Sequence, residues 1–258
     1  MRLIFLAVAM ASSSPELSPE IDYDAPLPEG PLLLPGKLYP LNFSAGALTV
    51  HGLPIIAIET PNSGLGTGTT VWDGSVVLAK YLEHTTPPLG LAGRRVLELG
   101  AGPGVAGFAS AALGAEVALT DLPYVIPNLE AAATRNAHLP GRTRVAELDW
   151  FTPEEALAAA PFLATADVVL GADVVWLEEL IPGLVRTLAL LLRRAGSFAL
   201  IAHQTRSTRS DQLLFQQLAG AALRVEAVPR TLHHPTFSAD IIAILRVTAD
   251  AGDAAEEF

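Results

Sequence analysis

Three short apolar runs of the sequence each end in an aspartate. These aspartates are the first candidates for binding or catalysis. Asp121, Asp149 and Asp173 each close such a run, and Trp150 and Trp176 stand close by. Carboxylates bind ribose hydroxyls or a cationic amine, and an indole offers stacking area and a π face. If the runs are parallel strands, their carboxyl ends meet at the edge of the sheet where ligands bind.

A second stretch, residues 95–107, is rich in glycine. An apolar run that holds Glu98 leads into Gly100, Gly102 and Gly104, and a helical pattern follows. Glycine is needed where the backbone has a positive φ or where another group comes close. A strand, a glycine turn and a helix N-terminus together predict a pocket of free N–H groups. Such a pocket suits the ribose, phosphate or carboxylate of a nucleotide-like cofactor.

Two cofactors fit the glycine pattern. Residues 102–107 read G-x-G-x-x-G, with Asp121 about 20 residues on, which is typical of dinucleotide binding. The alternative begins at Glu98 and reads acid-x-G-x-G-x-G, the first motif of class I methyltransferases. An acid before the glycines favours an ammonium group and disfavours a pyrophosphate. S-adenosyl-L-methionine carries an amine, a sulfonium and a ribose but no phosphate, and both interpretations stay open here.

The elements that position these residues alternate apolar strands with helical patterns. Continuous apolar strands between helices predict a parallel sheet that is covered on both faces. The last two strands lack a long helix between them and are expected to form an antiparallel hairpin at the edge. The expected strands are 95–99, 116–120, 144–148, 167–172, 197–203, 223–228 and 241–247, and the expected helices are 105–113, 124–137, 180–194 and 212–222.

Flanking segments extend this core. Residues 12–40 are rich in Ser, Pro, Glu and Gly, so the N-terminal segment 1–42 is expected to be flexible, and the acidic tail 250–258 is expected to fray. A β-hairpin is predicted within 43–60, and an amphipathic helix within 70–84. The main domain therefore runs over 43–249, with its sheet core at 94–249.

Composition limits the partners. The chain has 258 residues and a net charge of −11, which argues against a nucleic-acid partner. It has no cysteine, so disulfides and thiolate chemistry are excluded. Residues 3–11 have the outline of a short signal peptide, but no apolar run reaches the roughly 18 residues of a membrane helix. We expect a soluble cytoplasmic monomer that binds neither membrane nor metal.

An ordered set of motifs resembles the family 16 lysine methyltransferases of the seven-β-strand class, which modify non-histone proteins. The similarity covers about residues 48–247. It implies a Rossmann-like class I methyltransferase fold that uses S-adenosyl-L-methionine. It rests on Val71-Trp72-Asp73, residues 97–104, Leu119-Thr120-Asp121-Leu122-Pro123, Asn136, Leu148-Asp149-Trp150 and residues 170–176.

The resemblance implies roles for single residues in cofactor binding. A tryptophan covers the cofactor, the glycine motif lines its methionine half, and an acid holds the ribose hydroxyls. Another acid and an aromatic ring bracket the adenine, and a small residue packs near the reacting end. The covering tryptophan is Trp72, and the acid for the ribose is Asp121. The methionine half is lined by Glu98, Gly100, Ala101 and Gly102. The adenine is bracketed by Asp149 and Trp150, and the small residue near the reacting end is Ala172.

The implied catalytic residues are Asp173 and Trp176, in the acid-x-x-aromatic motif of the family. Asp173 would orient the substrate amine, and Trp176 stands where the family usually has Tyr. An indole keeps the π face for a cationic amine but loses the phenol oxygen. Each acid has a structural alternative, since Asp121 and Asp173 are also suited to capping helices.

The acceptor is expected to be a lysine of a protein with basic segments, captured by the acidic surface. Three alternatives are a small-molecule acceptor, a NAD-dependent oxidoreductase and a catalytically silent binding protein on the same fold. Outside the motifs, His203 is expected to be a hydrogen-bonded histidine at a strand end. Arg206 and Arg209 are expected to lie in solvent.

Overall fold

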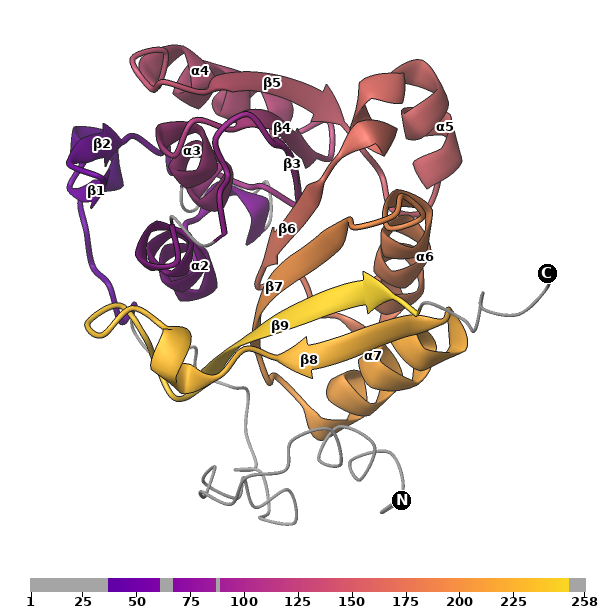
Figure 1. Ribbon diagram of the computed structural model, residues 1–258. Helices are drawn as coiled ribbons and strands as arrows, with labels where there is room; N and C mark the ends of the chain where they lie inside the picture. The colour runs from indigo at the N-terminus through magenta and orange to yellow at the C-terminus, as the bar shows by residue number, and fades with distance from the viewer. Residues whose placement is uncertain (1–36, 61–66, 87–88, 251–258) are drawn as a thin grey trace, which may run out of the picture. The chain divides into compact units, whose positions relative to one another are not determined.

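A seven-stranded sheet organises the chain, in the order β5-β4-β3-β6-β7-β9-β8 (Figure 1). The strands from β3 to β7 are parallel, and β9 runs antiparallel to both β7 and β8. The predicted parallel sheet with an antiparallel edge hairpin is confirmed. The strands are β3 (Arg95–Leu99), β4 (Glu116–Asp121), β5 (Arg142–Glu147), β6 (Val168–Ala172), β7 (Phe198–Gln204), β8 (Leu223–Ala227) and β9 (Ile242–Ala249).

The computed structural model describes residues 37–60, 67–86 and 89–250. The signal-like run 3–11, most of the lead-in 1–42 and the tail beyond residue 250 lie outside these ranges. Within them, no helix combines the length and apolar character needed to span a membrane.

Helices cover both faces of the sheet (Figure 1). One face carries α2 (Asp73–His84), α3 (Val105–Ala112) and α4 (Ile126–Arg135), and the other carries α5 (Pro153–Ala159), α6 (Ile181–Leu191) and α7 (Thr208–Gly220). Successive strand residues point to opposite faces, so Val96 joins one apolar cluster and Leu97 the other. Short 3-10 turns lie at Phe43–Ala45, Thr67–Thr69, Pro161–Thr165, Glu178–Leu180 and Arg230–Leu232.

Some element boundaries differ from those expected. Helix α7 begins at Thr208, four residues before the expected Gln212, because the Ser207 hydroxyl caps it by accepting the Ser210 N–H at 3.0 Å. Strand β5 begins two residues early, at Arg142, where the backbone pairs with β4 although the side chains are polar. These shifts move polar residues into regular elements that an apolar pattern does not mark.

The predicted N-terminal hairpin is present as β1 (Leu48–Val50) and β2 (Leu53–Ile55). Asn136, at the end of α4, ties it to the core. Its Oδ1 accepts the Ile56 N–H at 3.0 Å, and its Nδ2 donates to the Ile56 carbonyl at 2.6 Å. Since Asn136 is buried, its amide satisfies both backbone groups of Ile56 beyond the end of β2.

Replacing Asn136 with Ala should therefore destabilise the fold. The two backbone groups of Ile56 would lose their partners, which costs about 2–4 kcal/mol of unfolding free energy. Urea denaturation measures this loss. The control is Asn128→Ala in the same helix, which removes one side-chain hydrogen bond to Thr60 and should cost much less. Equal losses in the two variants would contradict the role of Asn136.

Candidate active site at the carboxyl ends of the strands

The glycine turn joins β3 to α3, and its N–H groups bind within the protein. The Gly102 N–H donates to Asp121 at 2.7 Å, the Ala101 N–H to the Thr120 carbonyl, and the Gly104 N–H to the Ala101 carbonyl. Gly104 has φ +80°, and a Cβ there would lie 2.7 Å from the Phe108 ring. The turn was expected to offer free N–H groups, and this expectation is wrong for the N–H groups of Ala101, Gly102 and Gly104.

Glu98 lies in β3, next to the glycine turn. Its side chain is buried, with the residue 2% exposed, and Oε2 accepts the Gly107 N–H in the first turn of α3 at 2.8 Å. Burial, with a smaller contribution from the charge of Asp121, raises the pKa of Glu98 to about 8, although the N–H groups of Gly107 and Ala106 oppose the shift. The Gly107 donor at the start of α3 is thus already taken by a carboxyl group. A direct contact of Glu98 with a cofactor stays a prediction.

Asp121 ends β4 beside the turn. Besides the bond from Gly102, its Oδ1 accepts the N–H of Leu122 at 2.7 Å. Burial raises the pKa of Asp121 above its ordinary value, although both N–H donors oppose the shift. The carboxylate is therefore held at the turn, next to the place where a ribose is expected, and its binding role stays a prediction.

Trp150 packs against the glycine turn from the β5 side. A Cβ built on Gly100 would lie 3.1 Å from Cζ2 of the Trp150 ring and 3.3 Å from the Val174 side chain. Asp149 accepts the N–H of Phe151 at 2.9 Å, so it shapes the loop in which Trp150 lies. The structure thus brings Trp150 and Gly100 together, and the adenine role of Asp149 and Trp150 stays a prediction.

Trp72 stands directly before α2, on a segment that crosses the glycine turn. Its Nε1 donates to the Thr67 carbonyl at 3.1 Å, which fixes the ring against the turn at Thr67–Thr69. The carbonyl oxygen of Gly68 would lie 3.1 Å from a Cβ on Gly102. Residues 67–84 are called the covering segment below. Gly68 of this segment contacts the glycine turn, and the role of Trp72 over the cofactor stays a prediction.

Asp173 follows β6 and is the most constrained of the predicted residues. Its φ is +54°, a conformation rare outside glycine, and its side chain is 5% exposed. Its Oδ2 accepts the Gly74 N–H at 2.9 Å, and its Oδ1 lies 3.4 Å from the Arg206 guanidinium. Ala172 lies half-buried just before it.

Arg206 corrects a sequence-based expectation, because its side chain is only 18% exposed and does not lie in solvent. Arg209 does lie in solvent, with its side chain 84% exposed and 3.0 Å from Glu178. One signal could have separated the two arginines. Arg206 comes just after β7, at the strand ends where the other site residues gather.

Trp176 lies on the surface, 43% exposed, while Asp173 is buried. It belongs to a group of exposed apolar side chains that all follow the carboxyl ends of β4, β5 and β6. Exposed apolar side chains at this edge of the sheet are available for contact with a partner. The group consists of Leu122, Tyr124, Phe151, Trp176 and Leu177.

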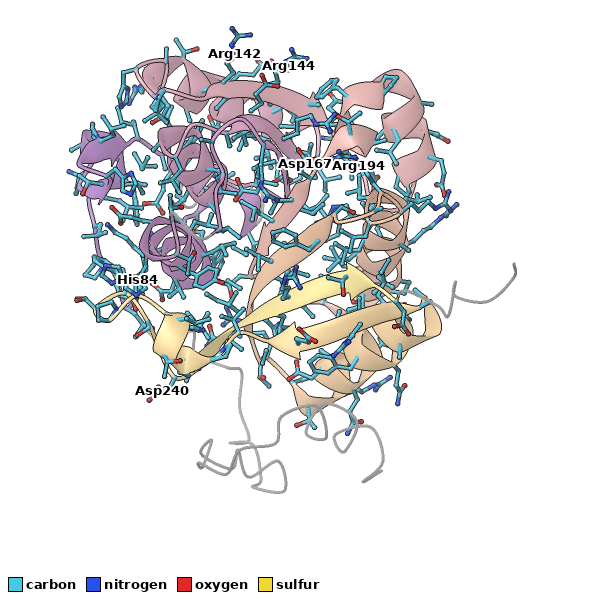
Figure 2. The ribbon with its side chains drawn as sticks, viewed as in Figure 1. His84, Arg142, Arg144, Asp167, Arg194 and Asp240 are labelled. Carbon is cyan, nitrogen blue, oxygen red and sulfur yellow. The ribbon has the colours of Figure 1, made fainter. Side chains whose placement is uncertain are left out.

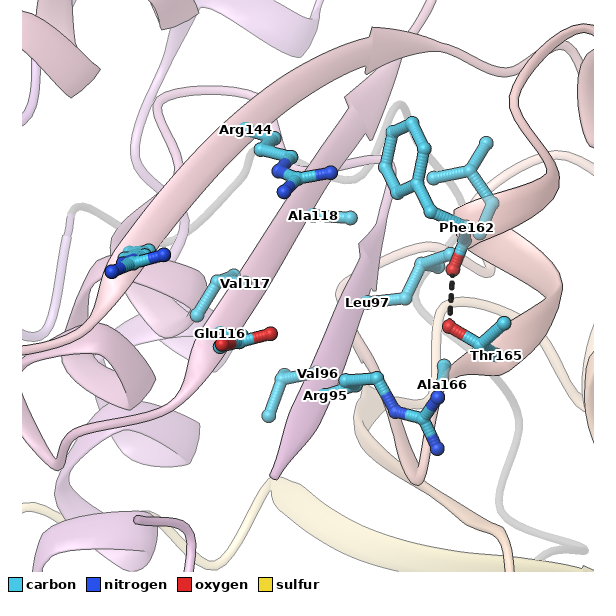
Figure 3. A pocket seen from close by; sticks show the side chains of 12 residues that line it. Arg95, Val96, Leu97, Glu116, Val117, Ala118, Arg144, Phe162, Thr165 and Ala166 are labelled. Atoms are coloured by element: carbon cyan, nitrogen blue, oxygen red, sulfur yellow. Dashed lines mark hydrogen bonds between the residues drawn. The ribbon is translucent and has the colours of Figure 1, made fainter. Parts of the chain in front are cut away.

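A small hollow of about 80 Å³ lies at the opposite ends of the strands (Figure 3). The first residues of β3, β4 and β5 line it. Cζ of the Arg144 guanidinium lies 5.4 Å from the centre of the Phe162 ring. Figure 2 shows Arg142 and Arg144 on the edge strand β5, where charged side chains discourage pairing with other chains. The hollow is far from the predicted site and is not part of it.

Two histidines outside the motifs are buried, and only one of them has a hydrogen-bond partner: His203 is paired, whereas neither ring nitrogen of His233 has a partner among the described residues. His203 is buried and its Nε2 lies 2.9 Å from Asp211, as expected for a hydrogen-bonded histidine at a strand end. Within residues 37–60, 67–86 and 89–250, no group of His, Asp and Glu is arranged to hold a metal ion.

The raised pKa of Glu98 predicts a pH-dependent stability. Between about pH 4.5 and 8 the folded protein holds this proton and the unfolded chain does not, so stability falls as pH rises through this window. The slope reaches up to about 1.4 kcal/mol per pH unit. In Glu98→Gln, which keeps an acceptor for Gly107, this slope should vanish in urea denaturation at pH 5, 6.5 and 8. Exposed Glu116→Gln is the control, and parallel curves for Glu98→Gln and the wild type would contradict the assignment.

Comparison with known proteins identifies the family. The lysine methyltransferase family matches residues 54–221. EEF1A lysine methyltransferase 3 of Mus musculus is 33% identical over 168 residues, 65% of this chain and 69% of that protein. Protein N-lysine methyltransferase METTL21A of Danio rerio is 37% identical over 151 residues, 58% of this chain and 66% of that protein. The precorrin-6y C5,15-methyltransferase structure from Geobacter metallireducens has a TM-score of 0.49 at 13% identity, covering 74% of this chain and 98% of that chain. The present chain belongs to the lysine methyltransferase family and is a protein-lysine methyltransferase.

Proposed function

We propose that the site at the carboxyl ends of β3 to β7 binds S-adenosyl-L-methionine and directs its methyl group to a lysine of a non-histone protein. One observation carries the cofactor assignment. Donors that would receive a phosphate, the Gly102 and Gly107 N–H groups, already bind Asp121 and Glu98. The site therefore offers carboxylates and indole rings, which suit an amine, a sulfonium and a ribose better than a pyrophosphate.

The chain's own residues would hold this cofactor as follows. Asp121 would accept the ribose hydroxyls, Asp149 and Trp150 would bracket the adenine, and Trp72 would cover the group from the covering segment. Glu98 with Gly100, Ala101 and Gly102 would line the methionine half, and Ala172 would pack near the reacting end. When bound, the sulfonium supplies a methyl group that is open to in-line attack by a neutral nitrogen.

On the acceptor side, a substrate lysine must reach the methyl group without its proton. Its ordinary pKa is about 10.4, and burial against aromatic side chains lowers this value by desolvation. Asp173 would accept an N–H of the neutral amine and orient its lone pair. Trp176 would wall the entrance, since it is exposed and follows Asp173, whose side chain is buried, by three residues. Alignment of nitrogen and methyl carbon then provides much of the rate.

The partner is proposed to be a basic segment of a cytoplasmic protein. The net charge of −11 supports capture by charge complementarity, and the exposed side chain of Trp176 offers apolar surface for contact. We propose that the protein acts as a monomer and binds neither nucleic acid nor membrane.

Cofactor binding is tested with S-adenosylhomocysteine. This product should raise the melting temperature of the wild type, whereas NAD should not, because no phosphate-binding donors are free at Gly102 and Gly107. Asp121→Ala should weaken the affinity for the product roughly 10- to 100-fold in calorimetry, as expected for a lost charge-assisted contact. Asp240→Ala, an exposed loop acid, serves as the control. Stabilisation by NAD alone would refute the proposed cofactor.

Methyl transfer is tested with radiolabelled cofactor in a cell lysate, followed by peptide mapping of the labelled lysine. Trp176→Ala should leave stability within about 0.5 kcal/mol, because the residue is exposed, and should raise KM for the protein acceptor several-fold. The matched control is Phe162→Ala, an aromatic residue of similar exposure at the other end of the strands. Label on small molecules alone would favour a small-molecule acceptor instead.

A further inference from the structure

The guanidinium of Arg206 contacts two of the proposed site residues at once. It lies 3.4 Å from Oδ1 of Asp173 and 5.8 Å from the centre of the Trp72 ring. These residues come from three separate segments, the loops after β7 and β6 and the start of α2. Arg206 therefore joins the covering segment to the carboxyl ends of the central strands.

Asp173 needs such a partner because its side chain is 5% exposed. A buried carboxylate is costly unless its oxygens are hydrogen-bonded or paired. Oδ2 has the Gly74 N–H, and Oδ1 has Arg206. Burial raises the pKa of Asp173 and the charge of Asp73 adds to this, whereas Arg206, the Gly74 N–H and His203 lower it. Among these groups, arginine alone keeps a full positive charge at every working pH.

We propose that Arg206 is a positioning residue for methyl transfer, which keeps Asp173 charged and aimed so that the incoming lysine amine meets an acceptor. This inference rests on the proposed function of Asp173. Without Arg206, a protonated Asp173 would donate to the amine nitrogen and occupy the lone pair that attacks the methyl group. The contact with Trp72 adds a second effect, because it holds the covering segment at the same point.

The guanidinium is suited to both contacts. Its planar fork can face a carboxylate along its edge and an indole with its face, whereas a lysine ammonium is a point charge. Arg206→Lys should therefore keep Asp173 charged and recover part of the activity, while Arg206→Gln should not.

The test compares Arg206→Gln with the matched control Arg209→Gln, three residues along and exposed to solvent. In Arg206→Gln we expect kcat to fall roughly 10- to 100-fold, as for a misplaced reacting group. The acid limb of the pH profile should move to higher pH, because Asp173 then ionises later. Affinity for S-adenosylhomocysteine should fall by a smaller factor than kcat, because Trp72 loses the Arg206 contact but keeps its hydrogen bond to the Thr67 carbonyl. Arg209→Gln should match the wild type.

A second measurement does not depend on activity. Carboxyl carbon NMR of labelled aspartate, with the Asp173 signal assigned by its loss in Asp173→Asn, should show titration at higher pH in Arg206→Gln than in the wild type. An unchanged titration would overturn the inference. So would a lower KM for the acceptor with undiminished kcat, which would show that Arg206 only blocks the entrance. If the wild type methylates no protein, the proposed function fails, and the NMR titration still decides the role of Arg206.

Discussion

Three buried carboxyl groups, each bound to a glycine N–H of another segment, hold the site together. Glu98 accepts from Gly107, Asp121 from Gly102 and Asp173 from Gly74. A side chain on two of these glycines would collide with the acid, since a Cβ on Gly74 or Gly107 would lie 2.5 Å from the carboxyl oxygen. The close approach gives each buried oxygen a partner, and it joins β3 to α3, β4 to the glycine turn, and β6 to α2.

These pairs also define the chemistry of the site. Because carboxyl groups occupy the donors, the site has acidic and aromatic character, which suits the family to which the chain belongs. The same arrangement raises the pKa of all three acids by burial, so their charge depends on what lies next to them. The charge of Arg206 lowers the pKa of Asp173, whereas the negative charge of Asp121 raises the pKa of Glu98.

Local pattern in the sequence predicted much of the fold. Strand β3 has the bounds expected for it, and acids were placed correctly at the ends of β4 and β6, because strand periodicity and glycine are local signals. The sequence pattern could not show that the Arg206 side chain points inward, since its partner Asp173 is 33 residues earlier, in the loop after the neighbouring strand β6. The sequence pattern also could not show that the carboxyl groups of Asp121 and Glu98 accept the N–H groups of Gly102 and Gly107. Those contacts depend on tertiary packing, and no spacing rule encodes them.

The long sequence separation of the contacts at Gly74 has a consequence for synthesis on the ribosome. The covering segment emerges before its partners, because Asp173 follows Gly74 by 99 residues. The hairpin has the same dependence on Asn136, which follows Ile56 by 80 residues. Both N-terminal pieces can therefore gain these hydrogen bonds only after the residues that supply them have been translated. The bond that links α2 to the loop after β6 is thus a late event in the maturation of the nascent chain.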